Sequence, residues 1–519
     1  MLEIFSILPL SFWAVIALLI GGGLLAWQRM EDGTGLPMLM VLVTTTAWYV
    51  GDAFYNDYAH NHAKRFEAGT LEGAWWQVAW FILVFLLITP PLHRWINRRY
   101  ERNKSGIVQL FQNGVDQPML QRQLGLLFTG CTWIWFGLFL IALVALKDET
   151  IYYLFPFLGY SASPWTHGRV GAGFDCLSVI GIYLQLLTAT MFGIVLALTT
   201  NNRIRRYALL LCLLAWPAFI FSRTRNTMLA MVIPAVLSWV FLRVHGGIWK
   251  KAVVLLACFL VVNVWMKFII ANRSQMSITQ AFHEKGLNLA EQKKVHNEGL
   301  NMYEELCWIS TFIDNGRYQV NWGERYFAEL VNPVPRALWP GKPLIGIDYA
   351  IARGHAQADD TQGGVNTTIS TGMIGQGVVN FGRVLGPAAS AILMSLWVIW
   401  LARFDLRIQE FGCLPLYALG IILTFNLGRD ITLITLYPFV FGALLVAWME
   451  HARSRRNQLV PAAAAESGPG EETRAKSVFP PNRSGHRRPL FPPTPQLEFF
   501  GRKAPAKMPV KQTPEPTSE

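Results

Sequence analysis

The chain has 519 residues, of which 52% are hydrophobic and only 15% are charged, so its composition excludes a soluble globular protein. Its net charge of +12 would suit a nucleic-acid partner, but half of that excess lies after His451, where 12 Lys or Arg residues face 6 Asp or Glu residues. Most of the remainder lies in short segments between apolar runs. This distribution is the positive-inside pattern of membrane proteins, so we expect no nucleic-acid partner.

Apolar runs of about 18–25 residues recur along the chain, and each is long enough to cross a hydrocarbon core of about 30 Å as a helix. We therefore expect an all-α polytopic integral membrane protein with about eleven transmembrane helices. The residues before the first run include Glu3 and no basic residue, which is not typical of a signal peptide. We therefore expect this run to remain as a span rather than to be cleaved. The predicted spans are 6–27, 36–55, 74–95, 123–146, 173–199, 207–222, 226–243, 252–271, 384–402, 414–428 and 431–449.

Basic residues mark the exit of every odd-numbered span from the third onward. This pattern assigns those exits to the cytoplasm, so we expect the N-terminus and the long loop after span eight to be extracytoplasmic and the C-terminus to be cytoplasmic. The basic residues are Arg94, Arg98, Arg99, Arg102, Lys104, Arg203, Arg205, Arg206, Arg243, Lys250, Lys251, Arg403, Arg407, Arg453, Arg455 and Arg456.

We expect a transmembrane domain over 1–451, in which the segment 272–383 is a large external loop that is partly helical. Four prolines within 333–343 exclude an ordinary helix there, because each proline lacks a backbone donor and biases the preceding residue away from helix. An earlier stretch has apolar residues at helical spacing (Met302, Leu306, Ile309 and Ile313) followed by Asn315-Gly316, which predicts an amphipathic helix that packs on the bundle.

The last segment, 452–519, contains 12 of the 28 prolines and too few apolar residues for a core, so we expect a disordered basic tail. The six cysteines have no spacing typical of disulfides or zinc, and no Walker, HExxH or GxSxG motif occurs. We therefore expect no metal and no cofactor.

Six cations on the predicted outer side are candidates for one anion-binding cavity. Arginine suits this role, since its planar fork binds phosphate in a bidentate manner and keeps its charge. For each arginine near an apolar run, the alternative is that its side chain snorkels to the interface. For Arg429, a second alternative is a local structural pair with Asp430. The six are Arg223, Arg225, Arg273, Arg336, Lys342 and Arg429.

Three acidic residues, Glu324, Asp348 and Asp430, are candidates for a base that activates an acceptor hydroxyl, and the sequence does not choose among them. Nearby aromatic residues would stack on sugar rings or lie in the interfacial belt. They are Trp308, Trp322, Tyr326, Trp339 and Tyr349.

Four motifs over 200–450 give the chain a family resemblance. They are Phe221-Ser-Arg-Thr-Arg-Asn226 between two spans, Pro335-Arg-Ala-Leu-Trp-Pro-Gly-Lys-Pro343 in the loop, Ser370-Thr-Gly372 with Gly377-Val-Val-Asn-Phe-Gly-Arg-Val-Leu-Gly386 leading into a span, and Gly428-Arg-Asp430 before the last span. In this order the chain resembles the bacterial oligosaccharide repeat-unit polymerases of O-antigen, capsule and exopolysaccharide pathways. It departs from that family at Gln376, where members often carry glutamate.

The resemblance implies a metal-independent glycosyltransferase of the bacterial inner membrane. Its substrates would be oligosaccharide units on polyprenyl (undecaprenyl) pyrophosphate, polymerised on the outer face of that membrane. A flippase and a chain-length regulator are the partners implied. Arg223, Arg225, Arg336 and Arg429 would bind pyrophosphate, with Lys342 and Arg273 beside them, and Glu324 or Asp348 would activate the acceptor.

Two other functions stay open. An O-antigen ligase-type transferase would use the same lipid-linked donor with a different acceptor. A transporter of lipid-linked oligosaccharide is the alternative from another class, although such proteins usually carry internal repeats and broken helices, and the sequence indicates neither.

Overall fold

The fold is described from a computed structural model of the chain. It describes residues 8–56, 58–100, 103–114, 116–155, 158, 163–165, 175–220, 225–271, 301–331, 334, 338–343, 346–354, 369–410, 412–431, 436, 439–444, 446–448 and 451. Every regular element within these ranges is helical. The predicted tail 452–519 and the loop portion 272–300 lie outside them.

Six helical segments are long and apolar enough to cross a membrane, which confirms a helical membrane protein. Helices also lie at the other predicted spans, although the count of eleven and the orientation stay predictions. The six are Leu10–Gln28, Gly35–Phe54, Ala68–Ile96, Pro118–Leu146, Ile180–Leu198 and Gly372–Asp405.

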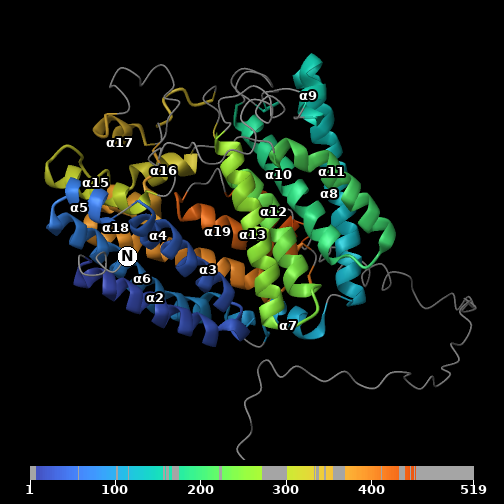
Figure 1. The fold of residues 1–519 in the computed structure, drawn as a ribbon, viewed down its shortest axis with the longest axis horizontal. Helices are drawn as coiled ribbons and strands as arrows, with labels where there is room; N and C mark the ends of the chain where they lie inside the picture. Colours follow the sequence, from blue (N-terminus) through green and yellow to red (C-terminus); the bar gives the residue numbers. More distant parts are fainter. Residues whose placement is uncertain are drawn as a thin grey trace, which may run out of the picture. The chain divides into compact units, whose positions relative to one another are not determined.

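Figure 1 labels the α-helices but not the short η segments between them. The described elements have a fixed order in the chain. They are α2 (Leu10–Gln28), η1 (Met30–Asp32), α3 (Gly35–Thr45), η2 (Thr46–Val50), α4 (Gly51–Tyr55), η3 (Tyr58–His62), α5 (Ala63–Arg65), α6 (Ala68–Ile96), η4 (Arg98–Tyr100), α7 (Gly106–Asn113), α8 (Pro118–Leu146), η5 (Lys147–Glu149), α9 (Thr150–Leu154), α10 (Asp175–Leu198), α11 (Asn202–Ile220), α12 (Arg225–Leu242), α13 (Ile248–Ala271), α15 (Met302–Asp314), α16 (Glu324–Val331), α17 (Ile347–Ala352), α18 (Gly372–Asp405) and α19 (Cys413–Leu427).

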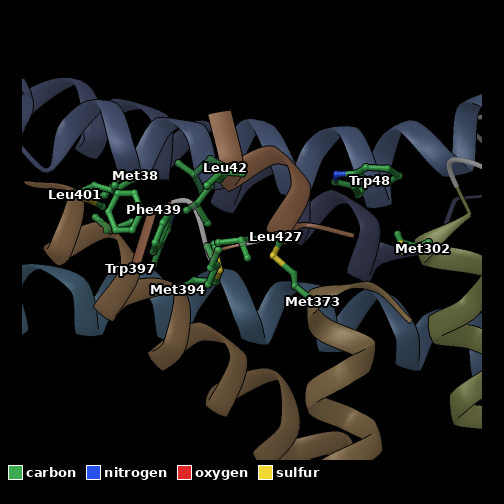
Figure 2. Packing of buried hydrophobic residues seen from close by; sticks show 14 of the residues in the cluster. Met38, Leu42, Trp48, Met302, Met373, Met394, Trp397, Leu401, Leu427 and Phe439 are labelled. Atoms are coloured by element: carbon green, nitrogen blue, oxygen red, sulfur yellow. The ribbon is translucent and has the colours of Figure 1, made fainter. Parts of the chain in front are cut away.

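The helices pack as two sets of neighbours. In one, α6 contacts α2 and α18, and α18 contacts α19 and α15; in the other, α10 contacts α8, α11 and α12. The first set holds the core drawn in Figure 2, where Met394 and Leu427 are labelled near the ring of Trp397. That ring lies 4.7 Å from the ring of Phe439. Dispersion within this dense interior, rather than a hydrophobic drive, holds helices together inside a bilayer.

The helix α18 begins twelve positions before the predicted span at 384 and is broken at Gly382, whose φ is 78° and ψ is −176°. The second half, after this break, begins next to the predicted start of the span at 384, whereas the expected lack of a broken helix is wrong. The two halves fold back on each other, since Ser390 Oγ donates to the Met373 carbonyl at 2.8 Å. A Cβ added at Gly377 would lie 2.2 Å from the Gly386 oxygen, so this close approach requires glycine.

The predicted amphipathic helix is present as α15, which ends before Gly316 with its φ of 68°. Met302, Leu306 and Ile309 are fully buried against the bundle. Gln77 Nε2 of α6 donates to Ser310 Oγ at 3.1 Å, which joins the two helices.

The two ends of α6 make different polar contacts, one with α15 and one with α18. At one end, the Tyr303 hydroxyl donates to the Leu71 carbonyl. At the other end, Asn97 Nδ2 donates to the Ile399 carbonyl. Because a helix rises about 1.5 Å per residue, these contacts are about 40 Å apart along α6.

Candidate functional site

Arg325, in the first turn of α16, is the centre of the best-supported site. Its side chain is 4% exposed, and Nη2 lies 4.0 Å from Asp430 Oδ1, which is an ion pair longer than a hydrogen bond. Nε and Nη1 are buried and have no hydrogen-bond acceptor among the described residues. Buried unsatisfied donors are costly, so this guanidinium is suited to receive an anion.

Gly346 allows α17 to approach the same guanidinium. Its φ of 68° is in the left-handed region, and an added Cβ would lie 3.3 Å from Arg325 Nη2. A side chain at this position would crowd the arginine and strain the backbone.

Asp430 is held by the segment that precedes α18. Its Oδ1 accepts from Thr371 N at 3.1 Å and from Thr371 Oγ1 at 3.2 Å. Burial raises the pKa of the Asp430 carboxyl, and the Arg325 charge partly offsets this effect. Arg429 Nε donates to Ser370 Oγ at 2.7 Å while the residue remains exposed. Two of the motifs that carry the family resemblance, at 370–372 and 428–430, therefore meet beside Arg325.

Gln376 joins these motifs a second time. Its Oε1 accepts from Ile431 N at 2.8 Å and its Nε2 donates to the Ile431 carbonyl at 3.2 Å. A carboxamide can do both at once, whereas a carboxylate can only accept. The glutamine thus has a positioning role that the expected glutamate cannot fill in the same way.

Of the predicted acids, Glu324 directly precedes Arg325 in the chain, and Asp348 is held by Tyr318. Its hydroxyl donates to Asp348 Oδ2, which also accepts from Asn321 Nδ2 at 3.4 Å. Burial, followed by the charge of Asp348, raises the pKa of Tyr318, while the Arg325 charge opposes the increase and that of Glu324 adds to it. Asp348 and Glu324 are both exposed, so an incoming hydroxyl can reach either one.

An apolar groove of about 450 Å³ starts at Ile431, next to Asp430, and follows α18. Leu393, Trp397 and Trp400 line it, and it ends beside Arg403. The span from Leu393 to Arg403 is about 15 Å long at the helical rise. Since Ile431 directly follows Asp430 in the chain, the apolar groove begins close to the polar site, and this arrangement fits an amphiphile with an anionic head.

The six predicted cations are only partly described. Arg223, Arg273 and Arg336 lie outside the described residues, and so does the side chain of Arg225, the first residue of α12. Their predicted convergence is therefore untested.

The other two cations are engaged within the protein. Lys342 is buried, and its Nζ donates to the Val334 carbonyl at 3.0 Å. Arg429 does not pair locally with Asp430 by a hydrogen bond but contacts Ser370. The ion pair of Asp430 is made by Arg325 instead.

Tyr349 fits neither of its two predicted roles, sugar stacking or the interfacial belt. It is fully buried, and its hydroxyl donates to Glu305 Oε2 at 2.5 Å. The same carboxylate receives Arg353 Nη2 at 2.8 Å, and the Arg353 guanidinium lies 4.6 Å from the Trp308 ring centre. Trp322, in contrast, is 73% exposed and remains free to contact a ligand.

Arg325 is the residue that the sequence did not single out. Its buried face on α16 also carries Ala328 and Glu329, so two of the three buried positions are charged. Hydrophobic periodicity cannot find such a face, and only its position next to Glu324 was a signal.

Nothing among the family models, the curated proteins or the solved structures that were compared matches this chain.

Proposed function

We propose that this protein is a membrane glycosyltransferase that polymerises polyprenyl-pyrophosphate-linked oligosaccharide units on the outer face of a bacterial inner membrane. The observation that carries the proposal is Arg325, a buried guanidinium with two nitrogens that lack acceptors in the described part of the chain. It lies between Asp430 and Gly346. Both motifs that meet there belong to the set that resembles the repeat-unit polymerases.

In the proposed reaction, an acceptor hydroxyl attacks the anomeric carbon of the donor glycan. The bond from that carbon to the pyrophosphate oxygen breaks, and the pyrophosphate leaves with the electron pair. Arg325 neutralises the charge that develops on the leaving group, which is how fixed cations stabilise such a transition state. Asp348 takes the hydroxyl proton, and Glu324 is the second candidate for this base.

Asp430 has a positioning role in this scheme. Its Oδ1 accepts two hydrogen bonds from Thr371 while it faces Arg325, so it orients the guanidinium rather than taking a proton. The apolar groove that begins at Ile431 offers a path for the polyprenyl chain of the substrate.

The test is the length of the glycan ladder in cells whose chromosomal copy carries Arg325→Ala. We expect the ladder to collapse to single repeat units attached to their acceptor, because loss of a charge-stabilising group typically slows such a reaction about 100- to 1,000-fold. Arg317→Ala is the matched control, since Arg317 is exposed in the same external segment. Both variants must reach the membrane at the wild-type level.

The other outcomes identify the rival functions. Loss of all attached glycan with long lipid-linked chains would indicate a ligase. The break at Gly382 favours a transporter as second candidate, because discontinuous helices are common in that class. An unchanged ladder with Arg325→Ala would remove this arginine from the chemistry and favour that reading.

A further inference from the structure

A second polar cavity lies at the other end of α6, away from Arg325. It has a volume of about 370 Å³ and is enclosed by the last turns of α2 and α6 and by the segments that follow them. The polar residues in its wall include Arg29, Asp32, His93, Arg94, Asn97 and Tyr100. The proposed glycosyl transfer assigns no chemical role to any of them, although Asn97 also lines the far end of the apolar groove.

The charge of this cavity is positive. Arg94 is exposed and makes no ion pair or hydrogen bond within the described ranges. Arg29 Nη1 pairs with Asp32 Oδ2 at 2.9 Å, and Asp32 Oδ1 already accepts from Thr34 N, so this carboxylate is neutralised within the protein. Arg94 therefore supplies an uncompensated cation.

Two further guanidinium groups flank Tyr100 in the wall. Those of Arg403 and Arg407 lie 5.6 Å and 5.7 Å from its ring centre. Arg407 also pairs with Glu410, whereas no carboxylate pairs with Arg403 in the described structure. The field around the cavity thus attracts anions, and guanidinium groups select phosphate oxygens.

Asn97 adds a buried acceptor to this cationic wall. The residue is 2% exposed, and its Nδ2 is held by the Ile399 carbonyl at 3.1 Å. Its Oδ1 has no donor among the described residues. A ligand that carries a hydroxyl or amine next to its phosphate would satisfy this oxygen, whereas a bare phosphate, which has only acceptors at its oxygens when fully ionised, would not.

The surrounding surface indicates the depth of the cavity in a membrane. Trp27 and Trp95, in the last turns of α2 and α6, are 60% and 76% exposed. Exposed tryptophan at the end of a spanning helix is typical of the interface, where lipid headgroups lie.

We propose that this cavity binds the phosphate of an anionic phospholipid headgroup in the leaflet at the basic ends of the spans. Arg94 contacts the phosphate, Arg29 and Tyr100 form the wall, and Asn97 accepts from a headgroup hydroxyl. Basic pockets between transmembrane helices are a known mode of headgroup recognition. This inference does not depend on the glycosyltransferase proposal.

The test measures lipid retained by the purified full-length chain after exchange from mixed phosphatidylglycerol and phosphatidylcholine micelles into detergent. We expect wild type to retain phosphatidylglycerol selectively, and Arg94→Ala to retain about fivefold less, the effect of one basic residue at an anionic surface. Arg98→Ala is the matched control, because Arg98 is exposed one position beyond Asn97 and does not line the cavity. Thermal midpoints check that all variants fold.

Three results would overturn the proposal in part or in whole. Equal losses with Arg94→Ala and Arg98→Ala would mean diffuse surface charge rather than a site. Equal retention of both lipids by wild type would mean no headgroup selection. Binding of soluble glycerol 3-phosphate that depends on Arg94, without enrichment of phosphatidylglycerol, would keep the phosphate site but overturn its lipid source. Arg94→Lys should lose less than Arg94→Ala, since it keeps the charge.

Discussion

Single side chains decide the candidate site through the hydrogen bonds that they can make. Gln376 both donates to and accepts from the backbone of Ile431, the residue next to Asp430. Asp430 is the one carboxylate that pairs with Arg325 among the described residues, so Arg325 depends on the position of the segment 430–431. A change at Gln376 should therefore act on the site without touching the guanidinium.

We expect Gln376→Glu to lower the free energy of unfolding by about 1–3 kcal/mol, because the Ile431 carbonyl loses its donor and a buried carboxylate gains no new one. The thermal midpoint of the detergent-solubilised chain measures this change. Gln112→Glu, at an exposed position of α7, is the control and should leave the midpoint unchanged. Equal midpoints for the two variants would contradict the positioning role of Gln376.

At the scale of elements, the folded-back helix α18 brings the two ends of the site together. Its first half carries Thr371 at its cap and Gln376 within it, and its second half belongs to the bundle core. The halves can approach only because Gly377 and Gly386 face each other. Two small residues at a helix contact are the usual means of close backbone approach in membranes.

Gly377→Ala should destabilise this contact by about 1–3 kcal/mol, as for other overpacked interiors. Gly73→Ala in α6 is the comparison, since an added Cβ there meets no atom within 4 Å. Thermal midpoints and membrane yield would both fall for Gly377→Ala and not for Gly73→Ala. A Gly377→Ala chain with wild-type stability would mean that the two halves do not pack as described.

At the scale of the whole molecule, the contacts separate two polar ends. Thr371, Asp430 and Arg325 belong to one end, and Arg29, Arg94 and Asn97 belong to the other. The basic excess at the second end predicts that it faces the cytoplasm. The site for glycan chemistry would then face outward.

Cysteine labelling in spheroplasts tests this orientation. Arg317→Cys should react with a membrane-impermeant maleimide, and Gln112→Cys should react only after permeabilisation, since both positions are exposed. The wild-type chain, which keeps its six cysteines, gives the background; Cys131, Cys212, Cys307 and Cys413 are buried and Cys258 is half-buried. The reverse pattern would invert the topology, and labelling of both without permeabilisation would place them on one side.

The sequence alone determined the class of the protein and its local elements. Long apolar runs are helical in a bilayer because every backbone polar group must be satisfied within its own segment. For the same local reason, the spacing from Met302 to Ile309 was enough to predict α15, whose end at Gly316 needs only a glycine turn.

Only the tertiary structure revealed Arg325, the fold-back at Gly382 and the cavity beside Arg94. Each depends on which segments meet in the fold: Arg325 lies beside Asp430, Gly377 beside Gly386, and Arg29 lines the same cavity as Arg94. Periodicity reports the apolar face of one helix, whereas the burial of a charge depends on partners from elsewhere in the chain. The sequence therefore predicted where the helices lie, and the contacts between them decided which charges became buried.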